Sequence, residues 1–220
     1  MTIFGIGDSS ENCTFLTTKW DEAARMGCKF GITRATTTGV VVAGKPTLKQ
    51  DLRFVENCIS MYAVGMKHYP YCWFDPRVAL SSMEQADFFV RTIAKVTPSD
   101  IIIVDVENSG SYVTYKADSL SRLKNWLSYV EAATGKRPAI YSYPTFIDSL
   151  AILGDISWMK DYPFIVAHWD VTTPRIPYPW YPGSQIGWQY TAYMLGSRYG
   201  FYAVDKYHPT PRICLATMEE

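Results

Sequence analysis

The sequence predicts an α/β protein, an irregular TIM-like (β/α) barrel of eight strands with about five helices. Two observations predict this class. Short apolar runs alternate with helical patterns through the first two thirds of the chain, which is typical of a mostly parallel sheet with helices packed outside it. In the last third, the strands leave little room for helices between them. A chain of 220 residues can bury about 70% of its unfolded surface, so a single domain suffices.

Eight runs rich in Ile, Val, Tyr and Phe have the composition of β-strands. The expected strands are residues 3–7, 29–34, 69–74, 101–106, 138–143, 163–168, 185–190 and 202–206. The alternative is an open doubly wound sheet, but no Gly-rich phosphate loop follows the first run. The barrel is therefore the preferred fold.

Capping residues and apolar periodicity predict the helices between these strands. Thr17 and Thr18 can cap a first helix that ends at Gly27, and residues 48–64 form a second. A third begins at the capping box of Ser81 and its partner three residues later.

The last two helices are predicted by their ends and by one apolar face. The fourth helix ends at Gly135, and a short fifth follows Pro144. The apolar face of the fourth helix consists of Leu120, Leu123, Leu127 and Val130.

Composition excludes several classes of partner. The formal net charge of zero gives no electrostatic reason to expect nucleic acid or an anionic membrane. No run of 18 apolar residues predicts a membrane span. The first residues, MTIFGIGDSSEN, lack the pattern of a signal peptide, so we expect a protein made in the cytoplasm.

The five cysteines (13, 28, 58, 72 and 214) are odd in number and have no CxxC spacing. This argues against a zinc cage and against a complete disulfide framework. We expect free thiols, mostly buried, in a reducing compartment; one disulfide among them is the alternative.

The stretch IIIVDVEN contains the first candidate site. Asp105 and Glu107 lie two residues apart, so both side chains point to the same side of a strand that ends here. In a barrel, the functional rim lies at the carboxyl ends of the strands. Asp8 follows the first strand and Asp205 lies near the end of the eighth, so four acids face one cleft, with Arg34 as the nearby cation.

Crowded carboxylates cannot all ionise cheaply, so one proton is expected to be retained at neutral pH. An acid beside ionised partners is what glycoside hydrolysis requires. Alternatively, Asp8 caps a turn, Asp205 forms an ion pair with Lys206, or the acid pair holds Mg²⁺. The scattered histidines (68, 168 and 208) offer no ligand cluster, so we expect no metal.

These motifs resemble the family 25 glycoside hydrolases, the muramidase-type lysozymes of bacteria, fungi and phages. IIIVDVEN is similar to the family's LDVE strand, and GDSSEN to its opening aspartate motif. KFGITRATTTG, DLRFVENCISMYAVGMK, YCWFDP, QADFF, GKRPAIYSYPTF, FIVAHWD, IGWQYT and YAVDKY continue in the family's order. Cys72 stands where the family has a histidine, which implies the loss of a polar contact at the cleft floor.

The resemblance implies an eight-stranded barrel that cleaves the β-1,4 bond between N-acetylmuramic acid and N-acetylglucosamine. It implies that Glu107 is the general acid and that Asp105 orients the acetamido group or stabilises the oxocarbenium-like state. Asp8 and Asp205 would tune the charge of the site and bind substrate or water. Whether a carboxylate, the acetamido oxygen or water is the nucleophile stays open.

The same resemblance places sugar-contacting residues at the strand ends. These are Tyr71, Trp73, Tyr141, Trp169 and Gln189, together with Arg34. For the aromatic residues, core packing is the alternative.

We therefore expect residues 1–220 to form one catalytic domain, with no separate cell-wall-binding module visible. Its partner would be bacterial cell-wall peptidoglycan, reached after phage release or secretion. We expect a monomer that needs no cofactor. A catalytically weak glycan-binding protein that kept the cleft is the alternative.

Overall fold

The computed structural model describes residues 1–10, 13–14, 20–42, 45–77, 79–96, 98–108, 115–191, 204–205 and 215–219. The strands are β1 (Thr2–Ser9), β2 (Cys13–Thr14), β3 (Phe30–Val42), β4 (Lys45–Gln50), β5 (Lys67–Trp73), β6 (Ile103–Asp105), β7 (Ala139–Ser142), β8 (Phe164–Ala167), β9 (Gly187–Thr191), β10 (Val204–Asp205) and β11 (Leu215–Glu219). The helices are α1 (Trp20–Arg25), α2 (Phe54–Ala63), α3 (Ser82–Ile93), α4 (Ala117–Thr134), α5 (Pro144–Leu153) and the 3₁₀ helix η3 (Ser157–Asp161).

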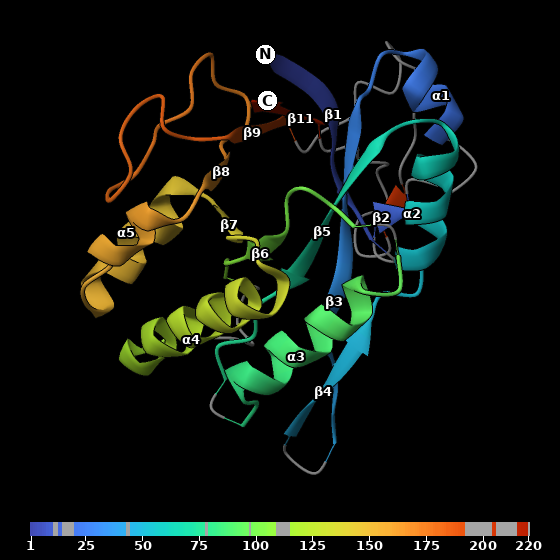
Figure 1. Cartoon of the computed structure of the whole chain (residues 1–220). Helices are drawn as coiled ribbons and strands as arrows, with labels where there is room; N and C mark the ends of the chain where they lie inside the picture. Colours follow the sequence, from blue (N-terminus) through green and yellow to red (C-terminus); the bar gives the residue numbers. More distant parts are fainter. Residues whose placement is uncertain are drawn as a thin grey trace.

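Eight of these strands close into a barrel, as predicted (Figure 1). Their order is β1-β11-β9-β8-β7-β6-β5-β3, and parallel pairing of β3 with β1 closes the ring. All neighbours are parallel except β11, which is antiparallel to both β1 and β9. Thr2 pairs with Glu219, so the two ends of the chain lie side by side.

The strand predicted at residues 202–206 does not close the barrel, and that prediction was wrong. Within it, only Val204–Asp205 is described as a strand, and this β10 pairs with β2 outside the barrel. The closing strand is β11, whose Ala216 and Met218 are buried against the inner core. Its sequence LATME is short and has few β-branched residues, so composition did not reveal it.

The helix predicted at residues 48–64 is shorter than expected. Only Phe54–Ala63 is helical, whereas Lys45–Gln50 forms β4 and pairs antiparallel with β3. The Thr- and Val-rich second half of β3 favours an extended conformation and offers an edge to the residues that follow it. The result is a long hairpin beyond the barrel wall (Figure 1).

The other helix signals are confirmed where they are described. Ser81 Oγ accepts from the backbone N–H groups of Met83 and Glu84, and the Glu84 carboxylate accepts from the Ser81 N–H, which completes the capping box. Helix α4 ends at Gly135 in the left-handed region, with φ of 69°. The predicted caps Thr17 and Thr18 lie outside the described residues.

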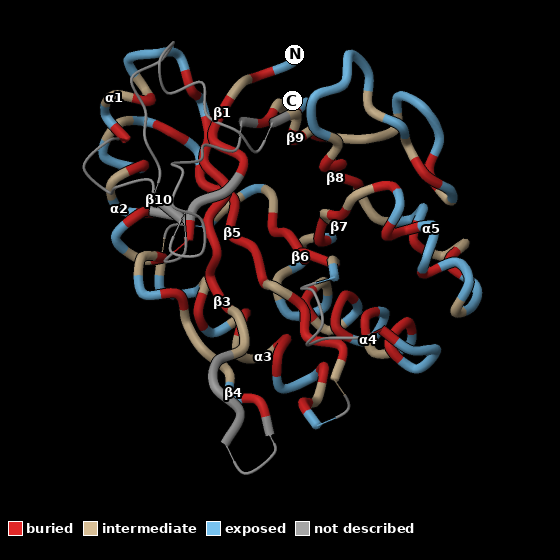
Figure 2. Tube along the Cα trace, turned by 180° about the vertical axis from the view of Figure 1, so that it is seen from behind, coloured by how far each residue is buried: buried red, intermediate tan, exposed pale blue. Residues whose placement is uncertain are grey.

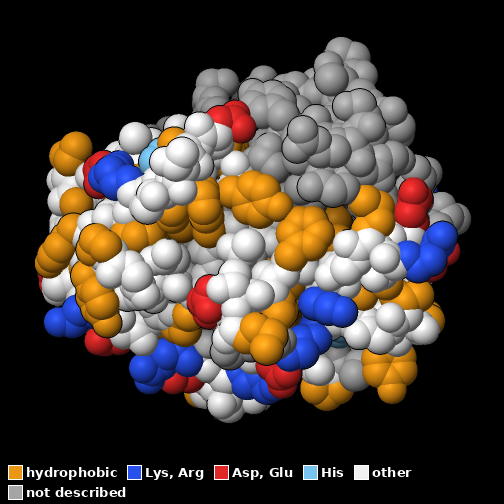
Figure 3. Space-filling model, turned by 90° about the horizontal axis from the view of Figure 1, so that it is seen from above, with side chains coloured by type: hydrophobic (Ala, Val, Ile, Leu, Met, Phe, Trp, Pro, Cys, Tyr) orange, Lys and Arg blue, Asp and Glu red, His pale blue; other side chains and the backbone are white. Residues whose placement is uncertain are grey.

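The core is divided by the barrel wall. One cluster fills the barrel and includes Ile103 and Ile165, and another lies between the wall and helices α3, α4 and α5. In Figure 2 the central parts of the barrel strands are mostly buried, whereas the helices alternate between buried and exposed residues. On the face seen in Figure 3, acidic and basic side chains are interspersed around a row of hydrophobic ones. No helix in the described part of the chain is long and apolar enough to cross a membrane.

Three of the five cysteines are described with their side chains, and all three are buried free thiols, as predicted. They are Cys28, Cys58 and Cys72. Burial raises the pKa of each thiol to about 12, because the thiolate loses its hydration.

We therefore predict that these three thiols resist a thiol-specific disulfide reagent at pH 8 in the folded protein. Thiolates are the reactive species, and burial both suppresses them and blocks access. A titration should show at most two of the five cysteines reacting before unfolding and all five reacting in denaturant, if all are reduced. A third fast-reacting thiol in the native protein would contradict the burial described above.

Candidate active site

The carboxyl ends of β5, β6 and β7 bring three predicted site residues side by side. In the parallel register, Trp73 pairs with Asp105, and Asp105 pairs with Tyr141. Phe74 N–H donates to the Asp105 carbonyl at 3.0 Å, and Val106 N–H donates to the Tyr141 carbonyl at 2.9 Å. Residues that are paired across parallel strands share a face, so these three side chains line the same side of the barrel wall.

The shared face is the inside of the barrel. Ile103, two residues before Asp105, belongs to the inner cluster, whereas Val104 and Val106 belong to the cluster under the helices. This alternation is what the sequence IIIVDVEN predicted. Asp105 is 7% exposed and Glu107, beyond the strand end, is partly exposed, so the second carboxyl group is the more accessible.

Two tyrosines that the sequence did not indicate lie close enough to this acid pair for its negative charges to raise their pKa values. Burial and the negative charges of Asp105 and Glu107 raise the pKa of Tyr115 well above its usual value. The pKa of Tyr143 is raised mainly by burial and then by Glu107. Both phenols therefore stay protonated and neutral beside the acids. Tyr143 follows β7 directly, a position that could have indicated it, whereas nothing in the sequence pattern marks Tyr115.

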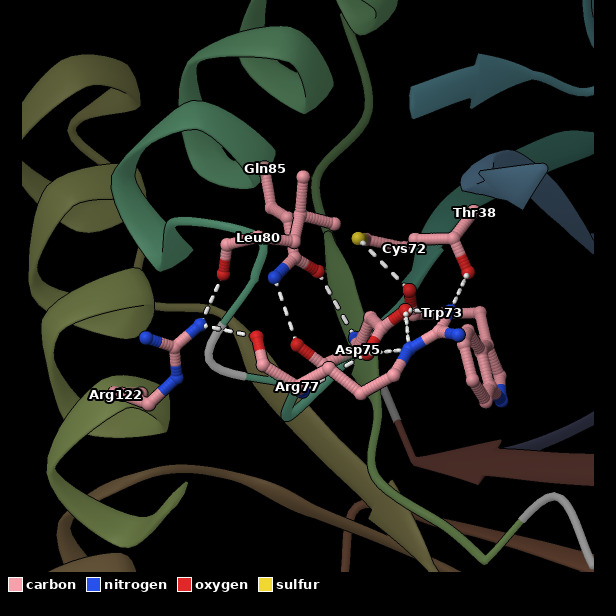
Figure 4. Close-up of polar contacts among 8 residues, drawn as sticks. All are labelled: Thr38, Cys72, Trp73, Asp75, Arg77, Leu80, Gln85 and Arg122. Carbon is pink, nitrogen blue, oxygen red and sulfur yellow. Dashed lines mark hydrogen bonds and ion pairs between the residues drawn. The ribbon is translucent and has the colours of Figure 1, made fainter. Parts of the chain in front are cut away.

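A further carboxylate, Asp75, lies two residues beyond β5 and is completely buried. Its charge helps to raise the pKa values of Cys72 and Tyr115, as does the charge of Asp105, so the two carboxylates lie near the same groups. Arg77 Nε donates to both Asp75 oxygens at 2.9 Å, and Arg77 Nη2 also contacts Asp75 (Figure 4). This ion pair therefore includes a carboxylate that acts on the same side chains as Asp105.

Gln189 on β9 joins three parts of the barrel. Its Oε1 accepts from Tyr141 Oη and from Trp169 Nε1, both at 2.8 Å. Its Nε2 donates to the Gly7 carbonyl at 3.2 Å. The side chain is 2% exposed, so it lies behind the residues it connects. Because Gly7 immediately precedes Asp8, this contact also fixes the backbone that leads to the first predicted acid.

Arg34, predicted as the cation of the cleft, forms a buried ion pair with Asp51. Its Nε and Nη2 each lie 2.8 Å from Asp51 Oδ2, and Asp51 is completely buried. Asp51 Oδ1 also accepts from the Arg53 N–H, so the pair secures the turn between β4 and α2. Sequence reasoning missed Asp51 because it lies 17 residues away, in a connection without a motif.

The remaining predicted residues differ in their placement. Tyr71 is 8% exposed within the inner cluster, whereas Trp169 is 41% exposed. The backbones of Asp8 and Asp205 lie in β1 and β10, and Asp205 pairs with Cys13 just after β1. The side chains of Asp8 and Asp205 lie outside the described part of the chain.

Cys72 does not lie at the cleft floor as the resemblance implied. It packs in the cluster between the barrel wall and the helices, and its Sγ–H donates to the Trp73 carbonyl at 3.5 Å. Trp73 and Tyr71, its neighbours along β5, belong to the inner face. The thiol therefore fills space outside the barrel.

The barrel has eight strands, mostly parallel, and a pair of carboxylates stands at the end of β6. The protein is therefore an α/β barrel with acidic residues on its rim. The model of the glycosyl hydrolases family 25 matches residues 14–196. The chain belongs to that family, and the predicted glycoside-hydrolase class is confirmed.

Individual relatives are more distant. A segment of 105 residues is 30% identical to the uncharacterized protein YegX of Escherichia coli K12, covering 48% of this chain but only 36% of YegX. The bacterial lysozyme from Streptomyces coelicolor is 20% identical, with a TM-score of 0.74 over 99% of this chain and 92% of that one. The autolysin LytC from Streptococcus pneumoniae, solved with a synthetic peptidoglycan ligand, is 17% identical, with a TM-score of 0.68 over 98% of this chain and 46% of LytC. These two structures share the fold.

We predict that Gln189→Leu lowers the free energy of unfolding by about 1–3 kcal/mol, because it removes the part-buried hydrogen bonds from Tyr141 and Trp169 and the buried one to the Gly7 carbonyl. Tyr141→Phe removes one donor only and should cost about 1 kcal/mol. Urea unfolding measures both. The matched control is Gln185→Leu, at a partly exposed loop position, which should change stability by less than about 0.5 kcal/mol. Equal effects at positions 185 and 189 would contradict the connecting role.

Proposed function

We propose that this chain is a peptidoglycan hydrolase that cleaves the β-1,4 bond between N-acetylmuramic acid and N-acetylglucosamine. The observation that carries the proposal is the end of β6, where Asp105 and Glu107 follow a strand whose inner face fills the barrel. Membership of glycosyl hydrolases family 25 supports it, and so does the likeness to a bacterial lysozyme.

Glu107 is the general acid in this proposal. It is the more exposed of the two acids, so a glycosidic oxygen can reach it. Protonation of that oxygen by Glu107 lets the leaving sugar depart as an alcohol. Two phenols that the charges of the pair affect, Tyr115 and Tyr143, stay neutral, and a phenol does not compete for the proton as a base at neutral pH.

Asp105 stabilises the positive charge that develops at the sugar ring. It is nearly buried between Trp73 and Tyr141 in the register, so water screens its charge weakly. A fixed anion in such surroundings acts on the transition state without reorganisation. Asp8 and Asp205 act from the neighbouring rim, binding substrate or water.

The sugar rings contact aromatic side chains at the rim. Trp73 and Tyr141 are partly exposed and Trp169 is exposed, so their rings can stack on a sugar face. Tyr71 is nearly buried within the inner cluster, Gln189 acts by holding Tyr141 and Trp169, and Arg34 acts with Asp51 on the shape of the wall.

We infer that the chain works as a single catalytic domain and as a monomer, without a cofactor, and that its partner is cell-wall peptidoglycan. The likeness to LytC, which was solved with a synthetic peptidoglycan ligand, supports this choice of partner. Its place of action is the cell wall, reached by phage release or by secretion.

Glu107→Gln should lower the rate of turbidity clearing of cell walls by roughly 10²–10⁴-fold, because the amide cannot donate the proton. Co-sedimentation with insoluble peptidoglycan should be unchanged, since the side chain keeps its size. The matched control is Glu131→Gln on α4, where a carboxylate pairs with Arg137 at the surface and activity should persist. If the Glu107 variant cleared cell walls at the parent rate, the assignment of Glu107 as the general acid would be wrong.

Mass spectrometry of digested cell walls identifies the bond. Products that end in a reducing N-acetylmuramic acid are expected. If the parent protein binds walls but releases no reducing ends, the chain is a glycan-binding protein that kept the cleft, and the hydrolase proposal fails.

A further inference from the structure

The turn after β5 carries a guanidinium that the proposed hydrolysis does not use. We propose that Arg77 is a binding position for a carboxylate group of the glycan substrate, beside the acid pair of β6. The inference rests on the proposed function and adds to it a recognition element for anionic substituents.

The turn that carries Arg77 is fixed by two helices (Figure 4). Gln85 of α3 accepts from the Asp75 N–H at 2.9 Å and donates to the Asp75 carbonyl at 2.8 Å. Arg122 of α4 donates to the Arg77 carbonyl at 2.7 Å and also contacts the Leu80 carbonyl. A turn that is held from both sides keeps its side chains in place, and this rigidity lowers the entropy cost of binding a ligand.

The guanidinium itself is oriented by Asp75 and by the neighbouring strand. Arg77 Nε and Nη2 bind the Asp75 carboxylate, and Nη2 reaches Thr38 Oγ1 of β3 at 3.4 Å. Within the described residues, Nη1 makes no hydrogen bond, and the side chain is 29% exposed while that of Asp75 is 0% exposed. The guanidinium is therefore held through Nε and Nη2, while the side chain keeps part of its surface exposed.

Two guanidinium groups and one carboxylate meet at this turn. Within the turn the charges of Arg77 and Asp75 balance, and Arg122 of α4 adds a positive charge where it binds the carbonyl group of Arg77. Hydrogen bonding to Asp75 raises the pKa of Arg77, which keeps the guanidinium charged. The planar group of arginine suits carboxylates, because two parallel N–H groups can meet two oxygens.

The position relative to the acid pair fits a sugar polymer. Trp73 at the end of β5 pairs in register with Asp105, and Arg77 lies four residues further along the chain. Asp75 and Asp105 both act electrostatically on Tyr115 and Cys72. Because Arg77 binds Asp75, its guanidinium is linked to a carboxylate that acts on the same groups as Asp105, which suits a substrate with a developing positive charge at one sugar and a carboxylate nearby.

Peptidoglycan offers such carboxylates from two sources. The lactyl group of N-acetylmuramic acid is a free carboxylate where the peptide has been removed, and the stem peptide carries carboxylates where it is present. Both have the same chemistry, and the ligands used in the test distinguish them.

The test compares the affinities of protein variants for glycan ligands with and without free carboxylates. In the Glu107→Gln background, which prevents turnover, Arg77→Met is titrated calorimetrically with two purified glycan oligomers, one peptide-free and one carrying stem peptides. Each is also used after its carboxylates have been converted to methylamides. Arg77→Met should weaken binding of at least one carboxylate form by about 10-fold or more and leave its amide form within about twofold. The oligomer that responds identifies the source of the carboxylate.

Controls separate recognition from a merely structural role. Arg91→Met on α3 removes an equally charged side chain whose ion pair with Asp87 is exposed, and it should change no affinity. Arg77→Lys keeps the charge but loses the planar group, so it should give an intermediate affinity, and it carries the test if Arg77→Met does not fold.

The inference is overturned if both Arg77 variants weaken carboxylate and amide ligands equally, or weaken neither. The first result would mean that the Asp75–Arg77 pair only holds the turn. If the parent protein releases reducing ends from peptidoglycan while the variants show no preference, the proposed hydrolysis stands and this inference alone fails.

Discussion

The in-register parallel pairing of β5, β6 and β7 is the constraint on which the candidate site depends. Strand β6 has only three residues, yet it holds Asp105 between Trp73 and Tyr141 on the inner face. A slip of one residue would turn Asp105 into the apolar cluster under the helices and bring Val104 into the barrel. Burying an unpaired carboxylate in such a cluster is costly, so the hydrophobic pattern itself enforces the position of the acids.

The candidate site also depends on how the carboxylates near β6 are surrounded. Asp105 and Glu107 have protonated phenols as neighbours, and these do not neutralise them. Asp75, in contrast, is neutralised by Arg77 within a turn that two helices fix. Nearby carboxylates thus differ in their surroundings: Asp75 forms an ion pair with Arg77, whereas Asp105 and Glu107 lie close to neutral phenols.

Much of this arrangement was predictable from local patterns. The β6 alternation, the capping box of α3 and the glycine end of α4 are each set by residues within one or two turns of chain, so sequence alone predicted them. The closing strand β11 was missed because its burial depends on two distant partners, β1 and β9. Asp51, Asp75 and Gln189 were missed or assigned another role for the same reason, since each is defined by contacts that tertiary folding creates.

The position of Cys72 shows how far a family pattern can mislead about one side chain. The resemblance implied a lost polar contact in the cleft, but the thiol packs against the helices with Phe74 and Val104. Its neighbours Tyr71 and Trp73 keep the inner face, so the alternation of β5 is undisturbed. A small, buried, protonated thiol fits an apolar cluster better than an imidazole, which would need a hydrogen-bond partner there. The replacement therefore changes packing outside the barrel and leaves the acid pair with its surroundings.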